Sequence, residues 1–374
     1  MHAHNTFKIA VYPGDGIGTE VIAIAQAVLE RLQSALGGFQ LTFEQHAAGA
    51  AYYKDSGEEI SAASMKAAHT ADAILLGAMG LPDVRLPDGR EIAPHLQMRD
   101  ELGLYAGVRP VKAYPNTPRP LLDERAASID LIVLREFTEG LFYSQTFGEV
   151  IGDQEARETL RISRPVTEKL FDVGFKLARR RKGKGGPGTT KGLVTCVDKA
   201  NVFRAYAFFR KIGYERAALN PDIAFATNYV DAQALDLIRR PWDFDVLVME
   251  NMFADILSDL GGGLVGGMGM APCAELGDNH GLFQPAHGSA PDIAGRGMAN
   301  PTATVLSTAM MLEWLGERHG VPKMVEAAEM LEAAVEQGFE VRALRPMEFG
   351  GDQGSAEFAR SLLESRDRRL KAHS

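Results

Sequence analysis

Short apolar runs alternate with amphipathic stretches from the start of this chain. The runs at 7–14, 41–49 and 72–79 have the composition of buried strands, whereas 20–36 and 60–70 carry apolar residues at helical spacing. Strands that alternate with helices form a mostly parallel sheet with helices packed on its faces. This alternation predicts an α/β fold.

A second series of the same kind occupies the middle of the chain. We expect strands at 129–137 and 192–200, and helices at 164–181, 201–212 and 226–240. The chain closes with predicted helices at about 302–319, 322–338 and 355–365. A chain of 374 residues is too long for one ordinary core, so we expect two domains or one large α/β unit.

Composition limits the classes of function. Apolar residues make up 45% of the chain, charged residues 24%, and the net charge is −9, which is typical of a soluble globular protein. The one notable basic cluster, at 179–186, ends a helix and enters a glycine-rich loop, so we expect no nucleic-acid partner. No stretch of about 18 uninterrupted apolar residues occurs and the N-terminus lacks a signal-peptide pattern, which predicts a cytoplasmic protein without a membrane partner. Cys196 and Cys273 lie in apolar surroundings and are interpreted as reduced packing residues.

The segment VLVMENMFADILSD at 246–259 changes from an apolar strand into a helix that carries two acids. Asp255 and Asp259 are four residues apart, so both carboxylates lie on one helical face and repel one another. Water, an arginine or a cation must compensate that repulsion. The pair therefore indicates either a solvated helix face or a site for Mg²⁺ or Mn²⁺, which prefer carboxylate oxygens.

Two glycine-rich stretches invite a dinucleotide-binding interpretation. Gly261, Gly263 and Gly266 have the G-x-G-x-x-G spacing, but they follow a helix, whereas the fingerprint follows a strand and opens a helix. The stretch GDGIG at 14–18 lies between a strand and a helix but has the wrong spacing. We therefore expect a tight turn at 14–18 and no Rossmann domain.

Seven short motifs occur in a fixed order along the chain. They are GDGIGTE at 14–20, Arg99 with Arg109-Pro110, LRE at 134–136, VDKAN at 197–201, YVD at 229–231, DILSD at 255–259 and HGSAPD at 287–292. This ordered set, between about residues 8 and 365, closely resembles the isocitrate and isopropylmalate dehydrogenase family, the β-decarboxylating dehydrogenases. The resemblance implies an isopropylmalate dehydrogenase-like fold of two interleaved domains, the first comprising 1–105 with 266–374 and the second comprising 106–265.

The resemblance also implies an enzyme that oxidises a malate-type 2-hydroxy acid with NAD(P) and a divalent metal, and then removes its β-carboxylate. Three arginines match the family's substrate-binding positions, where planar bidentate donors suit a dianion: Arg99, Arg109 and Arg135. Three aspartates match its ligands for Mg²⁺ or Mn²⁺: Asp231, Asp255 and Asp259.

Lys199 matches the family's active-site lysine, which accepts the hydroxyl proton as hydride departs. In the family this lysine and the residue at Asp231 reach the site from the partner subunit. The resemblance therefore implies a homodimer with shared active sites.

The cofactor loop is expected near the other end of the chain. The stretch HGSAPDIAGRGMANP resembles the family's adenosine-binding loop, and its expected cofactor-binding residues are His287, Gly288, Ser289, Ala290, Asp292 and Asn300. NAD-dependent members carry an acid at Asp292, which would bond a ribose 2′-hydroxyl and repel a 2′-phosphate. A turn-forming aspartate is the alternative for Asp292 alone. We predict NAD rather than NADP.

The segment before the first arginine contacts the variable group of the substrate in this family. Isopropylmalate enzymes have small apolar residues where this chain has His95 and Leu96, and isocitrate enzymes have a serine at the position of Ala93. His95 offers a hydrogen bond or a positive charge, which favours a polar substrate end, as in malate or tartrate. A histidine that caps a loop is the alternative.

One catalytic position departs from the family pattern. A tyrosine is expected seven residues after Arg135, as the acid that protonates the enolate carbon, but this chain has Phe142 there and Tyr143 next to it. If these residues continue a strand, Tyr143 points away from the face that carries Arg135. We predict that Tyr143 is mainly structural.

Two alternative functions remain. One is a non-decarboxylating dehydrogenase that stops at the keto acid. The other is a non-catalytic regulatory subunit of a heteromeric dehydrogenase, although such a subunit is expected to lose the lysine and metal ligands that this chain keeps.

Overall fold

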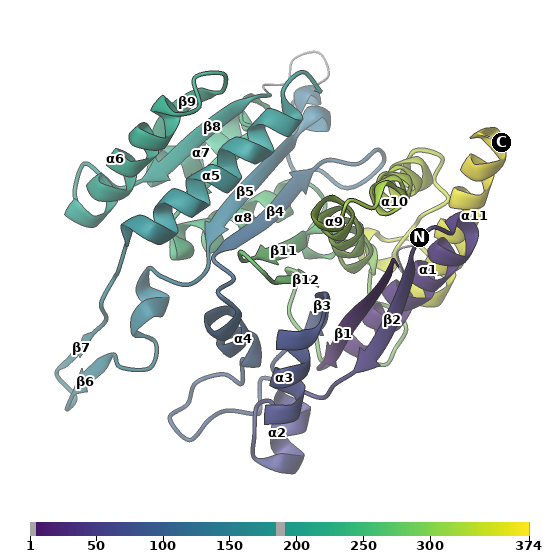
Figure 1. Cartoon of the computed structure of the whole chain (residues 1–374), viewed down its shortest axis with the longest axis horizontal. Coiled ribbons are helices and arrows are strands. Elements are labelled where there is room, and N and C mark those ends of the chain that lie inside the picture. The colour runs from purple at the N-terminus through teal and green to yellow at the C-terminus, as the bar shows by residue number, and fades with distance from the viewer. Residues whose placement is uncertain (1–4, 185–190, 374) are drawn as a thin grey trace. The chain divides into compact units, whose positions relative to one another are not determined.

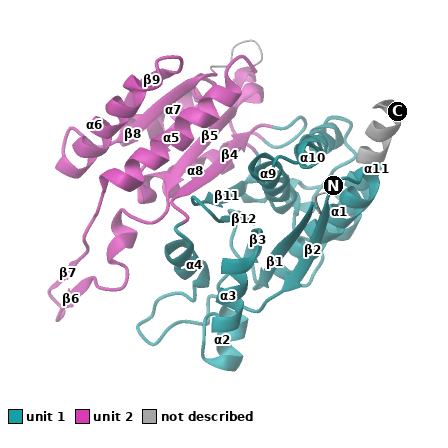
Figure 2. Cartoon of the chain, viewed as in Figure 1, with its two compact units in different colours: residues 1–103, 114–118, 266–374 teal, residues 104–113, 119–265 magenta. Residues whose placement is uncertain are grey.

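A computed structural model of the protein describes residues 5–184 and 191–373. The chain divides into two compact units, drawn in different colours in Figure 2. Unit 1 comprises residues 1–103, 114–118 and 266–374, and unit 2 comprises 104–113 and 119–265. The short segment 114–118 thus belongs to unit 1, whereas the sequence assigned all of 106–265 to the second domain.

Unit 1 contains five neighbouring strands in the order β2 (Gln40–Gln45), β1 (Thr6–Gly14), β3 (Ala73–Ala78), β12 (Gly281–Pro285) and β11 (Pro272–Leu276). All neighbours are parallel except β11 and β12. Every residue of β3 is buried, as expected for a parallel strand covered on both faces. The helices of this unit are α1 (Gly18–Leu36), α2 (Ala50–Ser56), α3 (Ala62–Thr70), α4 (Pro94–Leu102), α9 (Thr302–His319), α10 (Pro322–Glu340) and α11 (Ser355–His373) (Figure 1).

Unit 2 repeats the plan with strands in the order β4 (Ala106–Lys112), β5 (Asp130–Glu136), β10 (Val246–Met249), β8 (Leu193–Asp198) and β9 (Ala224–Tyr229). Among these five strands, only the β4–β5 pair is antiparallel. Its helices are α5 (Arg164–Arg181), α6 (Arg204–Ala218), α7 (Val230–Arg239) and α8 (Asn251–Leu264), and a hairpin of β6 (Glu149–Ile151) and β7 (Glu155–Arg157) extends from it (Figure 1).

The strands β5 and β10 of unit 2 are covered on both faces, which their side chains reach alternately. Val133 and Leu247 belong to an apolar cluster that includes Leu257 of α8. The next residues along, Leu134 and Val248, face Gly174 of α5, where an added Cβ would lie 2.9 Å from Val248. This two-sided burial explains the continuous apolar runs from which the strands were predicted.

Several predicted boundaries are wrong. The expected helix at 226–240 is a strand, β9, up to Tyr229 and a helix, α7, from Val230. The strand signal failed there because no residue of β9 is buried, so its sequence AFATNY lacks the continuous run of large apolar residues that marks a strand covered on both faces. The expected strand at 41–49 ends at Gln45. The last two residues of the basic stretch at 179–186 lie outside the described residues.

The first glycine-rich stretch is a strand-to-helix turn as predicted, whereas the second begins inside a helix and does not follow it. The turn at 14–18 joins β1 to α1, and Gly16 has a φ of +56° there. Gly261 and Gly263 lie inside α8, so no strand leads directly into them. A Cβ on Gly261 would lie 2.8 Å from Val111, which shows that the missing side chain allows α8 to pack closely on β4. Within the described residues, none of the helices is long and apolar enough to cross a membrane.

Candidate active site

Two arginines and two aspartates converge in unit 2. Arg109 of β4 and Arg135 of β5 lie on the same face of their antiparallel strands, the face that packs against α8. Asp255 and Asp259 lie on α8, which begins two residues after β10 ends. The sheet register and the helical spacing together bring the four side chains to one place.

The contacts within this cluster are ion pairs and hydrogen bonds. Arg109 Nη1 lies 3.2 Å from Asp255 Oδ1, 3.6 Å from Asp259 Oδ1 and 2.6 Å from the Ser258 hydroxyl. Arg135 donates to the same carboxylate of Asp255. The arginine side chains are at most 10% exposed, whereas Asp255 is 43% and Asp259 58% exposed. The cluster therefore presents carboxylates to solvent over buried positive charge.

The repulsion between the Asp255 and Asp259 carboxylates is offset by the guanidinium groups of Arg109 and Arg135. Burial still raises the pKa of Asp259, with Asp255 adding to the rise and Arg109 opposing it. Exposed carboxylate oxygens one helical turn apart match the donor set that Mg²⁺ or Mn²⁺ prefers, with positions left for other ligands. A third protein ligand does not join them: in the described part of one chain, no group of three or more His, Cys, Asp or Glu side chains could hold a metal ion.

Asp231 pairs instead with Lys199. Lys199 follows β8 and Asp231 follows β9, and the parallel pairing of these strands aligns Asp198 with Tyr229, so both residues leave the same edge of the sheet. Lys199 Nζ lies 2.5 Å from Asp231 Oδ1, and its hydrogen bond lowers the pKa of Asp231.

The turn that carries Lys199 is held by a partly buried ion pair between Arg210 and Asp198. Asp198 accepts from Arg210 Nε at 2.8 Å and Nη2 at 2.9 Å, and also from the Ala200 amide at 2.7 Å. These bonds fix the backbone that carries Lys199. The side chain of Asp231 is 66% exposed.

Arg99 and His95 lie one turn apart on α4, in unit 1. Arg99 forms a bidentate pair with Glu275, with Nε–Oε2 at 2.7 Å and Nη2–Oε1 at 2.6 Å, and both side chains are buried. Burial raises the pKa of Glu275, but Arg99 and, to a smaller extent, His95 reverse this and leave it below its usual value. Sequence reasoning missed Glu275, because 176 residues separate it from Arg99.

The predicted cofactor loop lines a pocket of about 380 Å³ in unit 1. Four of the six predicted residues line it: His287, Gly288, Ala290 and Asn300. Burial lowers the pKa of His287, and its Nε2 is buried without a hydrogen-bond partner among the described residues. A neutral imidazole with an unused ring nitrogen is a suitable partner for a bound ligand.

Ser289 and Asp292 do not line this pocket. The Ser289 hydroxyl donates to the Gly80 carbonyl at 2.5 Å, and its own carbonyl accepts from the Ile17 amide at 2.8 Å, so Ser289 fixes the loop. Asp292 is exposed. Glu348, which sequence reasoning missed, lines the pocket and accepts from Asn300 Nδ2 at 2.8 Å.

Known proteins match the chain over nearly its whole length. The isocitrate/isopropylmalate dehydrogenase family profile matches residues 8–359. The 3-isopropylmalate dehydrogenase of Aquifex aeolicus is 38% identical over 339 residues, covering 89% of this chain and 90% of the relative. The enzyme of that name from Xanthomonas euvesicatoria is 40% identical over 337 residues, with 88% and 90% covered. This chain belongs to the isocitrate/isopropylmalate dehydrogenase family.

Solved structures of the family share the fold. The isocitrate dehydrogenase of Methylococcus capsulatus superposes with a TM-score of 0.82 at 32% identity, covering 96% of this chain and 99% of that one. A β-decarboxylating dehydrogenase from Thermococcus kodakarensis gives a TM-score of 0.78 at 32% identity, with 98% and 97% covered. The predicted isopropylmalate dehydrogenase-like α/β fold is confirmed.

Phe142, where the resemblance implied a tyrosine, lies beside Arg135. The Phe142 ring centre lies 5.4 Å from the Arg135 guanidinium carbon, whereas Tyr143 packs against Arg161 at 3.9 Å and Phe147 at 5.1 Å. The predicted orientation is confirmed, but its stated reason is wrong. Both residues lie in a 3₁₀ turn, Leu141–Ser144, and not on a strand.

Proposed function

We propose that this protein oxidises a malate-type 2-hydroxy acid with NAD and a divalent cation, and that the keto acid then loses its β-carboxylate. The observation that carries the proposal is the cluster of Arg109, Arg135, Asp255 and Asp259. Few functions require two buried guanidinium groups beneath two exposed carboxylates. A dianionic substrate with a cation at its hydroxyl does require both.

Each charged group has a role in this proposal. Arg109 and Arg135 bind the substrate carboxylates, and Arg99 contributes when its pair with Glu275 exchanges. Asp255, Asp259 and Asp231 hold Mg²⁺ or Mn²⁺, which, when bound, acidifies the hydroxyl and stabilises the enolate. Lys199 accepts the hydroxyl proton, directly or through water.

The separation of Asp231 from the α8 aspartates supports a homodimer with shared sites. The helices α7 and α8 expose apolar side chains, with Leu235 at 54%, Ile238 at 45% and Ile256 at 62% exposed. Burying such residues against a second copy is favourable, and a two-fold axis would supply each site with Lys199 and Asp231 of the other chain.

NAD is the proposed cofactor, bound in the pocket beside His287 and Asn300. The proposal rests on the carboxylates of Glu348, in the pocket, and Asp292, in the loop, since either would repel a 2′-phosphate bound beside it. Comparable catalytic efficiency with NAD and NADP would contradict this choice.

The substrate end that differs between family members is proposed to be polar, because His95 lies one turn from Arg99. Malate and tartrate are the first candidates, and 3-isopropylmalate, on which the named relatives act, is the second. Steady-state assays with NAD and Mn²⁺ on malate, tartrate, isocitrate and 3-isopropylmalate distinguish them. A strong preference for 3-isopropylmalate would refute the polar pocket, and activity that survives exhaustive chelation would refute the metal.

A dehydrogenase that releases the keto acid is the second candidate function. Phe142 supports it, since no hydroxyl stands at the family's acid position beside Arg135. Measuring CO₂ together with NADH separates the two functions.

A further inference from the structure

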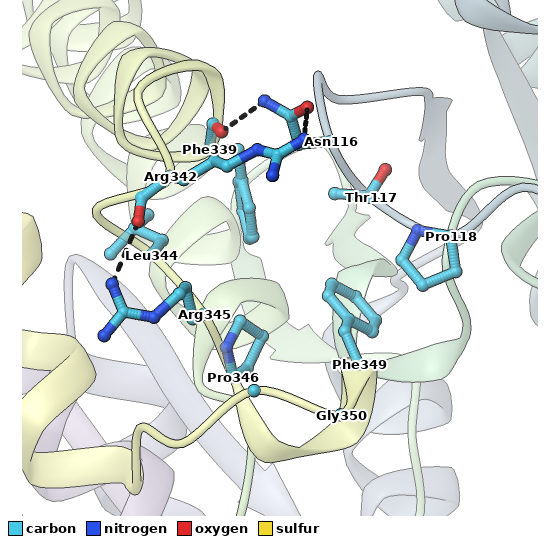
Figure 3. A pocket seen from close by; sticks show the side chains of 11 residues that line it. Asn116, Thr117, Pro118, Phe339, Arg342, Leu344, Arg345, Pro346, Phe349 and Gly350 are labelled. Carbon is cyan, nitrogen blue, oxygen red and sulfur yellow. Dashed lines mark hydrogen bonds between the residues drawn. The ribbon is translucent and has the colours of Figure 1, made fainter.

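Unit 1 contains a second pocket, of about 500 Å³, to which none of the functions above assigns a role. It lies between the segment at 114–118 and the segment at 339–351, which comprises the end of α10 and the residues after it (Figure 3). Its base is apolar, formed by Phe339, Leu344 and Phe349. Volume and lining are typical of a small-molecule site, in which an apolar cavity carries a few polar groups.

The polar side of this pocket carries an uncompensated positive charge. Arg342 is exposed, and among the described residues its side chain makes one hydrogen bond, a long one from Nη2 to Asn116 Oδ1 at 3.4 Å. No carboxylate among the described side chains pairs with it. Arg345, by contrast, is bound to Asp352, with Nε–Oδ1 at 2.9 Å. Arg342 is therefore the cation available to a ligand.

Arg342 and Asn116 also hold unfavourable backbone conformations. Three non-glycine residues have positive φ in the described chain, and two of them are Asn116 at +58° and Arg342 at +55°; the third, Ala290, lines the cofactor pocket. Arg342 occupies the position after the end of α10 where glycine is the usual left-handed residue. An arginine costs stability there, and such strain gathers at functional sites.

Asn116 is held in place independently of any ligand. Its Nδ2 donates to the carbonyls of Phe339 and Glu340, each at 3.0 Å, at the end of α10. Its Oδ1 is thereby aimed at Arg342 (Figure 3). The pocket thus has a fixed amide on one side and a guanidinium whose weak bond is readily exchanged.

We propose that this pocket binds a small organic anion: a compound with a compact apolar body and one carboxylate or phosphate group. The apolar body would cover Phe349 and Leu344, and the anionic group would pair with Arg342. A guanidinium binds either anion through charge-assisted hydrogen bonds.

The pocket is joined to the cofactor pocket by the short 3₁₀ turn Met347–Phe349. Met347 and Glu348 line the cofactor pocket, whereas Phe349 lines the second one. A ligand that orders this turn changes NAD affinity, and by linkage NAD changes the affinity for that ligand equally. This effect on NAD rests on the proposed function, whereas binding of the anion does not.

Calorimetric titration of the full-length protein tests the site with four probes: phenylacetate, phenyl phosphate, acetate and benzyl alcohol. We expect saturable binding of phenylacetate or phenyl phosphate, the tighter of the two identifying the anion class. Acetate lacks the apolar body and benzyl alcohol lacks the charge, so each should bind at least about tenfold more weakly.

Arg342→Gly is the informative variant, because glycine relieves the left-handed strain while it removes the charge. We expect unchanged or raised thermal stability and at least about tenfold weaker binding of the anion, with Arg342→Lys partly restoring it. Arg318→Ala, a change at another arginine of unit 1, should leave the affinity unchanged.

The proposal is overturned if neither anion binds the wild type, if benzyl alcohol binds as tightly, or if Arg342→Gly retains the affinity. A parallel titration with NAD separates the two claims. Anion binding without NAD binding would leave this site standing and refute the proposed cofactor, and NAD binding without anion binding would do the reverse.

Discussion

The amide oxygen of Asn251 accepts two hydrogen bonds from Arg135, at 2.9 Å from Nε and 2.7 Å from Nη2. Asn251 is fully buried, and its own Nδ2 donates to the Glu139 carbonyl at 3.1 Å. This chain of bonds fixes the guanidinium from behind, on the side away from Asp255. We therefore infer that Asn251 positions Arg135, the arginine proposed to bind the substrate.

Asn251→Ala should leave Arg135 in place but free to rotate. We predict a loss of about tenfold to hundredfold in kcat/KM, mostly through KM for the acid substrate, with KM for NAD unchanged. Asn220→Ala removes a surface asparagine of the same unit and serves as the control. Equal losses for both cofactor and substrate would point to misfolding and contradict the positioning role.

Phe142→Tyr should restore an acid beside Arg135. Positioned general acids contribute roughly 10²–10⁴ in rate, so we predict faster CO₂ release relative to NADH formation in rapid-mix experiments. Tyr143→Phe should change neither rate, because the Tyr143 ring packs on Arg161. A large drop in CO₂ release for Tyr143→Phe would show that Tyr143 is the acid.

Because Glu136 is buried, the free energy of unfolding should depend on pH. Burial raises its pKa to about 7, although its carboxylate accepts from Thr138 and from the Glu139 amide. A raised pKa means that the folded state binds the proton more tightly, so this contribution is complete below pH 4.5 and is lost as the pH rises towards 7. The rise in pKa from 4.5 to about 7 corresponds to roughly 3 kcal/mol in the free energy of unfolding.

Glu136→Gln should remove this dependence. We predict that urea unfolding shows the wild type losing stability relative to the variant between about pH 5 and pH 8, by up to roughly 3 kcal/mol. Parallel curves for the two proteins would show that Glu136 does not titrate in that range.

Asp15 should stabilise the predicted cofactor loop through Gly80, which bonds both Asp15 and Ser289. Its buried carboxylate accepts from the amides of Ala50 at 2.7 Å, Ala51 at 2.8 Å and Gly80 at 2.8 Å, and the Gly80 carbonyl accepts from Ser289. Asp15→Asn cannot accept all three bonds. We predict about tenfold weaker NAD binding by calorimetry, whereas Asp88→Asn, at an exposed turn, should have no effect.

The features that the sequence predicted correctly are those that depend on regular residue spacing. Asp255 and Asp259 were predicted to share a helical face, and they do, because a spacing of four leaves no other arrangement on α8. The buried strands were predictable for a similar reason, since burial on both faces requires continuous apolar residues. Phe142 was recognised as a departure by counting residues from Arg135.

Partners distant in sequence could not be predicted from one chain. Glu275 pairs with Arg99 and Glu348 with Asn300 only because the fold brings separate strands and loops together. The exposed strand β9 lacks the apolar pattern on which prediction depends. Ser289 was assigned to the cofactor pocket with its motif, whereas its hydrogen bonds place it in the support of the loop.

We propose that each active site combines α8 aspartates of one subunit with Lys199 of the other. Complementation tests it directly: Lys199→Ala and Asp255→Asn chains are purified separately, mixed, unfolded and refolded together. In a mixed dimer with shared sites, one site carries both substitutions and the other carries neither. We predict that the mixture regains about a quarter of wild-type activity, since half of the dimers are mixed and half of their sites are intact. If refolding of the wild type restores its activity but the mixture stays as inactive as either variant alone, each site is built within one chain and the account is wrong.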